Sequence, residues 1–151
     1  MKQLINLYKS NEVFFNIFLI SIFIFIFLNS TIGKYDLYAP DSNSFLQGSD
    51  YRTPGYPFFL KLIKLFNSDL SFLPIIQQFI IIFCGAVCFQ CLYSVKRSKI
   101  IWTITGIVSI CNPIIWKYTN FILSESLYIS ISFLFIGFLI KGLVSKSLKI
   151  I

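Results

Sequence analysis

The sequence predicts an all-α membrane protein with about four transmembrane helices and a long first loop outside the membrane. Hydrophobic residues make up 56% of the 151 residues, whereas soluble domains usually contain about 45–50%. The excess consists of isoleucine, leucine and phenylalanine in long runs, which is typical of membrane spans rather than of a large soluble core. Most lysines and arginines lie at the ends of those runs, where basic residues determine the orientation of a membrane protein.

The first expected span covers residues 13–32. Val13–Leu28 is apolar apart from Asn16 and Ser21, and its extension to Ile32 gives about 20 residues, enough to cross a bilayer. A cleaved signal peptide is the alternative interpretation. Its apolar core would normally be about 7–15 residues long and would be followed by small residues. The longer, aromatic-rich run favours an uncleaved membrane anchor.

Three further apolar runs predict spans at 73–95, 100–116 and 121–140. Basic residues follow the second and fourth spans, and an aromatic pair near the end of the third suits a membrane interface. A tight turn is expected at Lys117–Asn120, between the third span and the fourth.

The outer loop, residues 33–72, is expected to be irregular in its first half, where prolines and glycines recur. Its second half, Tyr56–Phe66, predicts a short amphipathic helix that lies in the membrane interface, because it is too short to span. Lys61 and Lys64 share one face of this helix, and we expect them to reach lipid headgroups. The lipid bilayer is therefore a predicted partner of the loop.

Counting basic residues orients the chain in the membrane. One side carries eight, namely Lys2, Lys9, Lys96, Arg97, Lys99, Lys141, Lys146 and Lys149. The other side carries five, namely Lys34, Arg52, Lys61, Lys64 and Lys117. The first side is the expected cytoplasmic side, so both termini would be cytoplasmic and the loop would face outward.

The composition also argues against several classes of function. A nucleic-acid site needs a basic stripe on a soluble face, which the placement of these charges does not provide. The sequence contains no histidine, which excludes a Ser-His-Asp triad, a histidine general base and a histidine-ligated zinc site. Cys84, Cys88 and Cys91 match the spacing of a radical-SAM cluster motif, but cysteines within a span predict helix packing instead. No residue is assigned as a metal ligand.

Asp41 and Arg52 are candidate functional residues in the outer loop. Asp41 follows a proline and precedes Ser42-Asn43-Ser44, so it could simply form a turn. Alternatively, its carboxylate could take a proton from a sugar hydroxyl or hold a divalent cation. Arg52 could pair with Asp50, or its guanidinium could contact a phosphate at the interface.

Glu125 is the acidic residue expected within a span, about one turn inside the fourth helix. One interpretation is a carboxylate near the interface, paired with Lys117 across the turn. The other is a carboxylate that faces a polar cavity shared with the outer loop, because charges inside membranes usually serve function.

In the outer loop, an Asp41-Ser42 element with an aromatic residue at Phe45 is followed by an R-x-P-G-Y-P element at Arg52–Pro57. With these elements the loop resembles the first outer loop of GT-C membrane glycosyltransferases. More narrowly, it resembles the bacterial relatives of protein O-mannosyltransferases and aminoarabinose transferases, which are related to glycosyltransferase family 39. Asn112-Pro113 and Leu123–Leu127 are similar to the turn between the third and fourth helices of that family.

The resemblance implies an enzyme of the bacterial inner (plasma) membrane and cell envelope. It would transfer a sugar from a polyprenyl-phosphate donor to a glycan, lipid or protein acceptor outside the cytoplasm. Asp41 would be the catalytic base and Glu125 a second acidic residue near the same cavity. Arg52, together with Tyr56 of the same element, is assigned to substrate binding, with Arg52 near the donor phosphate. A divalent cation is the one cofactor that stays open.

The family has many more membrane helices than the four expected here. The resemblance therefore implies that the chain is the N-terminal part of a larger GT-C module, a truncated form, or one that needs a partner. Two other functions stay open. The first is a small non-catalytic membrane protein that packs with or regulates a partner. The second is a piece of a transporter or channel with Glu125 on an ion path.

Overall fold

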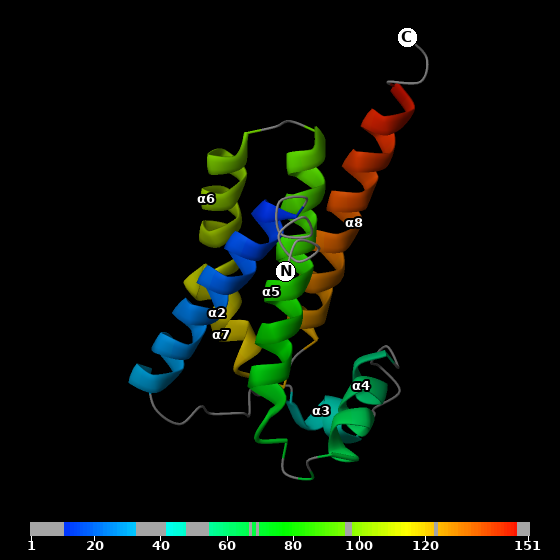
Figure 1. The fold of residues 1–151 in the computed structure, drawn as a ribbon. Coiled ribbons are helices and arrows are strands. Elements are labelled where there is room, and N and C mark those ends of the chain that lie inside the picture. The colour runs from blue at the N-terminus through cyan, green and yellow to red at the C-terminus, as the bar shows by residue number, and fades with distance from the viewer. Residues whose placement is uncertain are drawn as a thin grey trace.

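The computed structural model describes residues 11–32, 42–47, 55–66, 68, 70–95, 98–122 and 124–147. These ranges contain helices and turns but no strand, which confirms the all-α prediction (Figure 1). The helices are α2 (Glu12–Ile32), α3 (Ser42–Gln47), α4 (Gly55–Lys64), α5 (Leu73–Val95), α6 (Lys99–Ile110), α7 (Pro113–Thr119) and α8 (Glu125–Ser147).

Three helical stretches in this part of the chain are long and apolar enough to cross a membrane: Leu73–Ser94, Lys99–Lys117 and Glu125–Val144. They correspond to the second, third and fourth expected spans. The first expected span corresponds to α2, whose apolar stretch Glu12–Leu28 is shorter than the other three. A multi-pass membrane protein is therefore compatible with the structure.

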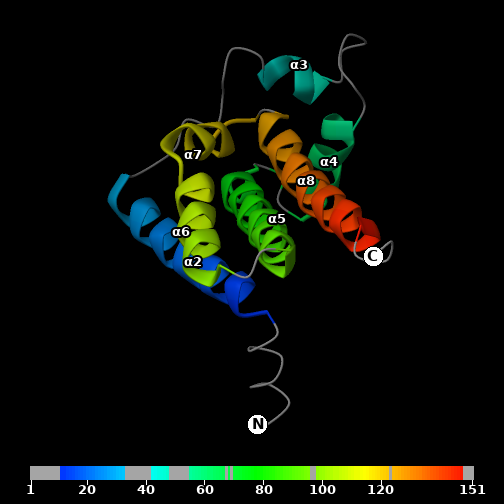
Figure 2. The same ribbon diagram turned by 90° about the horizontal axis from the view of Figure 1, so that it is seen from above.

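Helix α5 is the centre of the bundle. It contacts α2, α6 and α8, and its contact with α8 is the most extensive between any two helices described. In the apolar 18-residue window of Leu73–Ser94, 56% of the residues are buried, compared with 11% in the corresponding window of each of the other two stretches. These two stretches therefore turn most of their apolar surface away from the bundle, as helices that face lipid do. Figure 2 shows α2, α6 and α8 arranged around α5.

The long helices run in alternating directions, so their connections gather at two ends of the bundle (Figure 1). Helices α3 and α4 lie at the same end as the turn from α7 to α8, and this end is called the loop end below. At the opposite end, Lys99 at the start of α6 forms an ion pair with Glu12 at the start of α2. This grouping agrees with the predicted placement of the outer loop and the Lys117 turn on one side.

The third span differs from the prediction because it is broken into α6 and α7. Pro113 has no N–H to donate and forces Asn112 into an extended conformation, with φ −61° and ψ 128°. The Asn112 side chain then accepts a hydrogen bond from the Ile114 N–H at 2.8 Å and caps α7. Because α7 continues to Thr119, the turn expected at Lys117–Asn120 lies later in the chain, and α8 begins at Glu125.

The outer loop also contains more helix than expected. The helix predicted at 56–66 is present as α4, with Pro57 in its first turn. Its place in the membrane interface stays a prediction. In addition, Ser42-Asn43-Ser44 lies in a short helix, α3, which the sequence did not predict. The turn considered at Asp41 lies outside the described residues. A hydrophobic cluster joins both helices to the start of α5 and the α7–α8 turn. Its buried members are Phe45, Tyr56, Leu60, Ile63, Leu70, Leu73 and Ile122.

The contact between α5 and α8 depends on Gly137. A methyl group added at this glycine would lie 2.8 Å from the Cys88 Cα and 3.3 Å from the Cys88 carbonyl oxygen. Cys84, Cys88 and Cys91 are all buried along α5, so small residues on both helices allow the two backbones to approach closely.

Replacing Gly137 with alanine is expected to destabilise the bundle by about 1–3 kcal/mol, the usual cost of overpacking a close contact. The added methyl group would meet backbone atoms, which cannot rotate away, so the two helices must separate. The free energy of unfolding can be measured by titrating the purified protein from mild detergent micelles into SDS.

Gly142→Ala is the matched control, because it lies on the same helix and nothing lies within 4 Å of the added methyl group. Both variants gain the same helix propensity. Equal unfolding free energies for the two variants would contradict the close α5–α8 contact.

Candidate functional site

The loop end brings together segments that are far apart in the sequence. The Ser42 hydroxyl donates a hydrogen bond to the Ile122 carbonyl at 3.2 Å. Ser42 directly follows Asp41 in the sequence, and Ile122 lies in the turn that leads to Glu125. The start of α3 is therefore fixed beside the start of α8.

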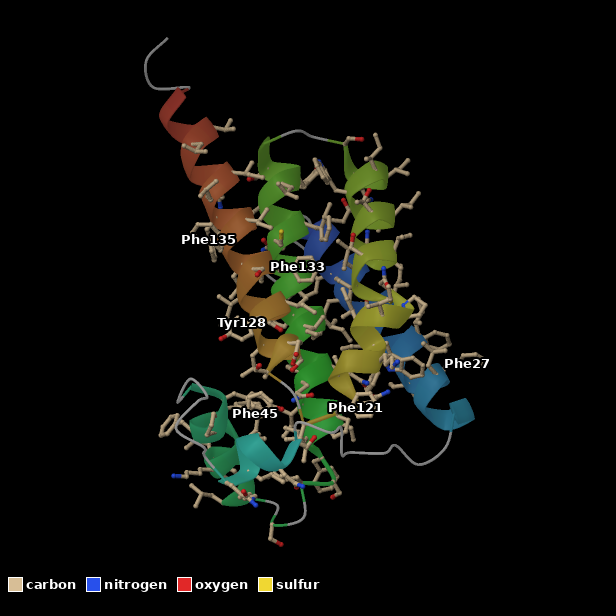
Figure 3. The ribbon with its side chains drawn as sticks, turned by 180° about the vertical axis from the view of Figure 1, so that it is seen from behind. Phe27, Phe45, Phe121, Tyr128, Phe133 and Phe135 are labelled. Carbon is tan, nitrogen blue, oxygen red and sulfur yellow. The ribbon has the colours of Figure 1, made fainter. Side chains whose placement is uncertain are left out.

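Tyr56, from the R-x-P-G-Y-P element, is anchored within the loop end. Its exposed fraction is 3%. Its ring meets Phe45 edge-on, with centroids 5.1 Å apart, and Figure 3 shows Phe45 on the side of α3 that faces the bundle. The Tyr56 hydroxyl lies 2.6 Å from the side-chain amide of Gln77. The element therefore begins α4 with an aromatic side chain that locks this helix to α5.

Gln77 links α4 to the end of α7 through a fully buried amide group. Its nitrogen is best oriented toward two carbonyl groups, donating to Thr119 O at 2.7 Å and to Phe121 O at 3.3 Å. In this orientation the Tyr56 hydroxyl donates to the Gln77 oxygen at 2.6 Å. The Gln77 side chain therefore provides hydrogen-bond partners for polar groups of both α4 and the end of α7. Buried polar groups need such partners.

Gln78 makes a second polar link at the same level of the bundle. Its side-chain nitrogen donates to Asn120 Oδ1 at 2.8 Å. Asn120 ends α7. Two adjacent glutamines of α5 therefore hold the turn between α7 and α8.

A groove of about 250 Å³ lies between the start of α4 and the first turns of α8. Its lining is mostly apolar with hydroxyl groups, and consists of Gly55, Tyr56, Ser124, Leu127, Tyr128 and Ile131. Figure 3 shows Tyr128 and Phe135 on the outer side of α8, whereas Phe133 points toward α5. The groove therefore opens on the side of α8 that faces away from the bundle, and its chemistry suits an apolar chain with a polar end.

The structure describes two of the four predicted site residues. Tyr56 lines the groove, although its hydroxyl is already bonded to Gln77. Glu125 is the first residue of α8 and is exposed, so its expected place one turn inside the helix is wrong. The reason is that α7 continues to Thr119, so α8 begins only at Glu125. Asp41 and Arg52 lie outside the described residues.

Glu125 forms no ion pair with Lys117 in the described part of the chain, and both side chains are exposed. The carboxylate does not line the groove, but its neighbour Ser124 does.

No metal centre is found among the described residues, since no three of their histidine, cysteine, aspartate or glutamate side chains could hold one ion together. Asp41, whose carboxylate is the candidate ligand for a divalent cation, lies outside the described residues.

Sequence reasoning missed Gln77 as part of this end of the bundle. Ser42 and Ser124 belong to the elements that carry the resemblance, but neither was assigned a role of its own. The available signal was the pair Gln77-Gln78 inside an apolar run, because amide side chains within a span must find partners. The partners themselves depend on the tertiary fold. No family model, curated protein or solved structure matches the chain.

Proposed function

We propose that this chain is the membrane-embedded N-terminal part of a glycosyltransferase of the bacterial inner membrane. It would transfer a sugar from a polyprenyl-phosphate donor to a glycan, lipid or protein acceptor on the extracytoplasmic side. The observation that supports this proposal is the meeting of three sequence elements at the loop end. Tyr56 and Ser124, from distant segments, line one end of a groove that opens outward. Ser42 donates a hydrogen bond to Ile122 in the turn that contains Ser124, and so lies beside these elements without lining the groove.

The proposed reaction is a single displacement with inversion at the sugar. The Asp41 carboxylate takes the proton of an acceptor hydroxyl, and the hydroxyl oxygen forms a bond to the anomeric carbon. The bond from that carbon to the phosphate oxygen breaks, and polyprenyl phosphate leaves with the electron pair. Arg52 would stabilise the negative charge of the leaving phosphate. Glu125 would supply a second negative charge near the acceptor side.

The groove between α4 and α8 fits the apolar chain of such a donor. Its lining residues Leu127 and Ile131 are apolar, and the exposed face of α8 continues the same surface away from the loop end. The isoprenoid chain would enter from the bilayer along α8, which places the phosphate near the start of α4.

A photoactivatable polyprenyl phosphate should label the chain in proteoliposomes, and Ile131→Trp should lower its affinity on the order of ten-fold, which corresponds to about 1.4 kcal/mol. The larger side chain fills the groove without touching the core, because Ile131 is 63% exposed. The measurement is the concentration dependence of labelling, followed by mass spectrometry of the labelled peptide.

Ile136→Trp provides the control, because Ile136 is 47% exposed on the same helix but does not line the groove. It lies five residues after Ile131, about 140° around the helix from the proposed path of the chain. Saturable labelling near the start of α8 that only Ile131→Trp weakens would support the proposal. Equal labelling of both variants, or an absence of saturable labelling, would favour a non-catalytic membrane protein or a transporter piece.

A further inference from the structure

Helix α4 presents three different faces. Tyr56, Leu60 and Ile63 are buried against the bundle. Since successive residues turn by about 100°, Lys61 and Lys64 follow on one flank of this buried face. Beyond them lies an apolar stripe, continued by the turn after the helix, that no described residue covers. Its members are Phe58, Leu62, Leu65 and Phe66, with exposed fractions of 62%, 43%, 77% and 91%.

Both lysines line a cavity of about 140 Å³ between α3 and α4. The remaining lining residues are Phe45, Leu46, Gln47, Pro57 and Leu60. The cavity therefore has an apolar floor that belongs partly to the buried cluster and a rim that carries two positive charges. Figures 1 and 2 show α4 at the loop end, beside the outer surface of α8.

Neither lysine pairs with a carboxylate among the described residues. Two ammonium groups three residues apart on one helix repel each other, and an anion between them removes that cost. Each ammonium group brings three hydrogen-bond donors, which the oxygens of a phosphate can accept.

We infer that the α3–α4 cavity binds the headgroup of an anionic phospholipid of the bilayer. The phosphate lies between Lys61 and Lys64, and the acyl chains lie along Phe58 and Leu62. A bilayer lipid is favoured over a free anion because the lysine flank of α4 adjoins its exposed apolar stripe. A phospholipid can place its phosphate against the lysines and its acyl chains against the stripe. This inference does not depend on sugar transfer, and it uses residues outside the groove between α4 and α8.

The test is a titration of fluorescent phosphatidylglycerol onto the purified full chain in nanodiscs made of phosphatidylcholine. Lys61→Gln and Lys64→Gln should each weaken binding about five-fold, and the double variant about twenty- to thirty-fold, because each basic group near a lipid surface contributes comparably. Native mass spectrometry should show one retained phosphatidylglycerol in the unmodified protein and its loss from the double variant. Both lysines are exposed, so the fold should tolerate these changes.

The double variant Lys117→Gln/Lys141→Gln is the matched control, with the same loss of charge at exposed positions that do not line the cavity. It should bind phosphatidylglycerol like the unmodified protein. The inference is overturned if the control loses as much affinity, or if labelled phosphatidylcholine binds equally well. It is also overturned if equimolar inorganic phosphate displaces the lipid, or if a second copy of the chain covers α4 without bound phospholipid.

Discussion

Replacing Asp41 with asparagine is expected to lower the rate of sugar transfer by about 10²- to 10⁴-fold, the usual contribution of a general base. Asparagine keeps the size of the side chain but cannot accept the proton of the acceptor hydroxyl. Labelling by the photoactivatable donor should change little, because the base acts on the acceptor. The measurement is transfer of labelled sugar from a polyprenyl-phosphate donor, using membranes that contain the protein together with the rest of its module.

Asp69→Asn serves as the control, since it is the same substitution in the same outer loop and carries no proposed role. Membrane insertion of both variants can be checked by resistance to alkaline extraction. Unchanged transfer by the Asp41 variant would refute its assignment as the base. A comparable loss in both variants would point to the charge of the loop as a whole.

Replacing Gln77 with leucine is expected to destabilise the protein by about 2–4 kcal/mol, because it leaves buried hydrogen-bonding groups without partners. The Thr119 and Phe121 carbonyls would lose their donor, and the Tyr56 hydroxyl would lose its acceptor. Helix α4 and the end of α7 should then detach from α5 before the rest of the bundle unfolds. Hydrogen exchange measured by mass spectrometry in nanodiscs would show faster exchange in α4 and α7.

Gln47→Leu is the matched control, because Gln47 is exposed in α3 and makes none of these bonds. It should leave the exchange of α4 and α7 unchanged. A double-mutant cycle with Tyr56→Phe separates the Tyr56–Gln77 bond from the two carbonyl bonds. An unaltered exchange pattern in the Gln77 variant would exclude its role as the link between these helices.

The sequence predicts the long helices well because each is a run of apolar residues long enough to span. The short elements were harder to place. Pro113 was visible in the sequence, but whether a proline bends, breaks or merely begins a helix depends on the partners of the surrounding backbone groups. In the folded chain, the Asn112 side chain caps a new helix, so the break moves the start of α8 by four residues from the predicted Phe121.

For the candidate site, the sequence indicated individual residues but not the contacts between them. The sequence assigned Tyr56 to substrate binding through its place in the R-x-P-G-Y-P element. Its side chain lines the groove, and its role in binding stays a prediction. The sequence could not show that Tyr56 bonds to Gln77, because that contact joins residues 21 positions apart through the packing of α4 on α5. It also placed Glu125 inside a helix because it could not foresee that α7 continues to Thr119.

The central position of α5 has a consequence for the biogenesis of the protein. Helices α2 and α5 leave the ribosome before α8. The face of α5 around Cys88 therefore initially lacks Gly137 of α8, which packs closely against it in the folded protein. A chain that stops before Glu125 would keep this face open to lipid and to other inserting helices. Since membrane chaperones and proteases act on incompletely packed chains, we expect the packing of α8 onto α5 to end the exposure of this face to them.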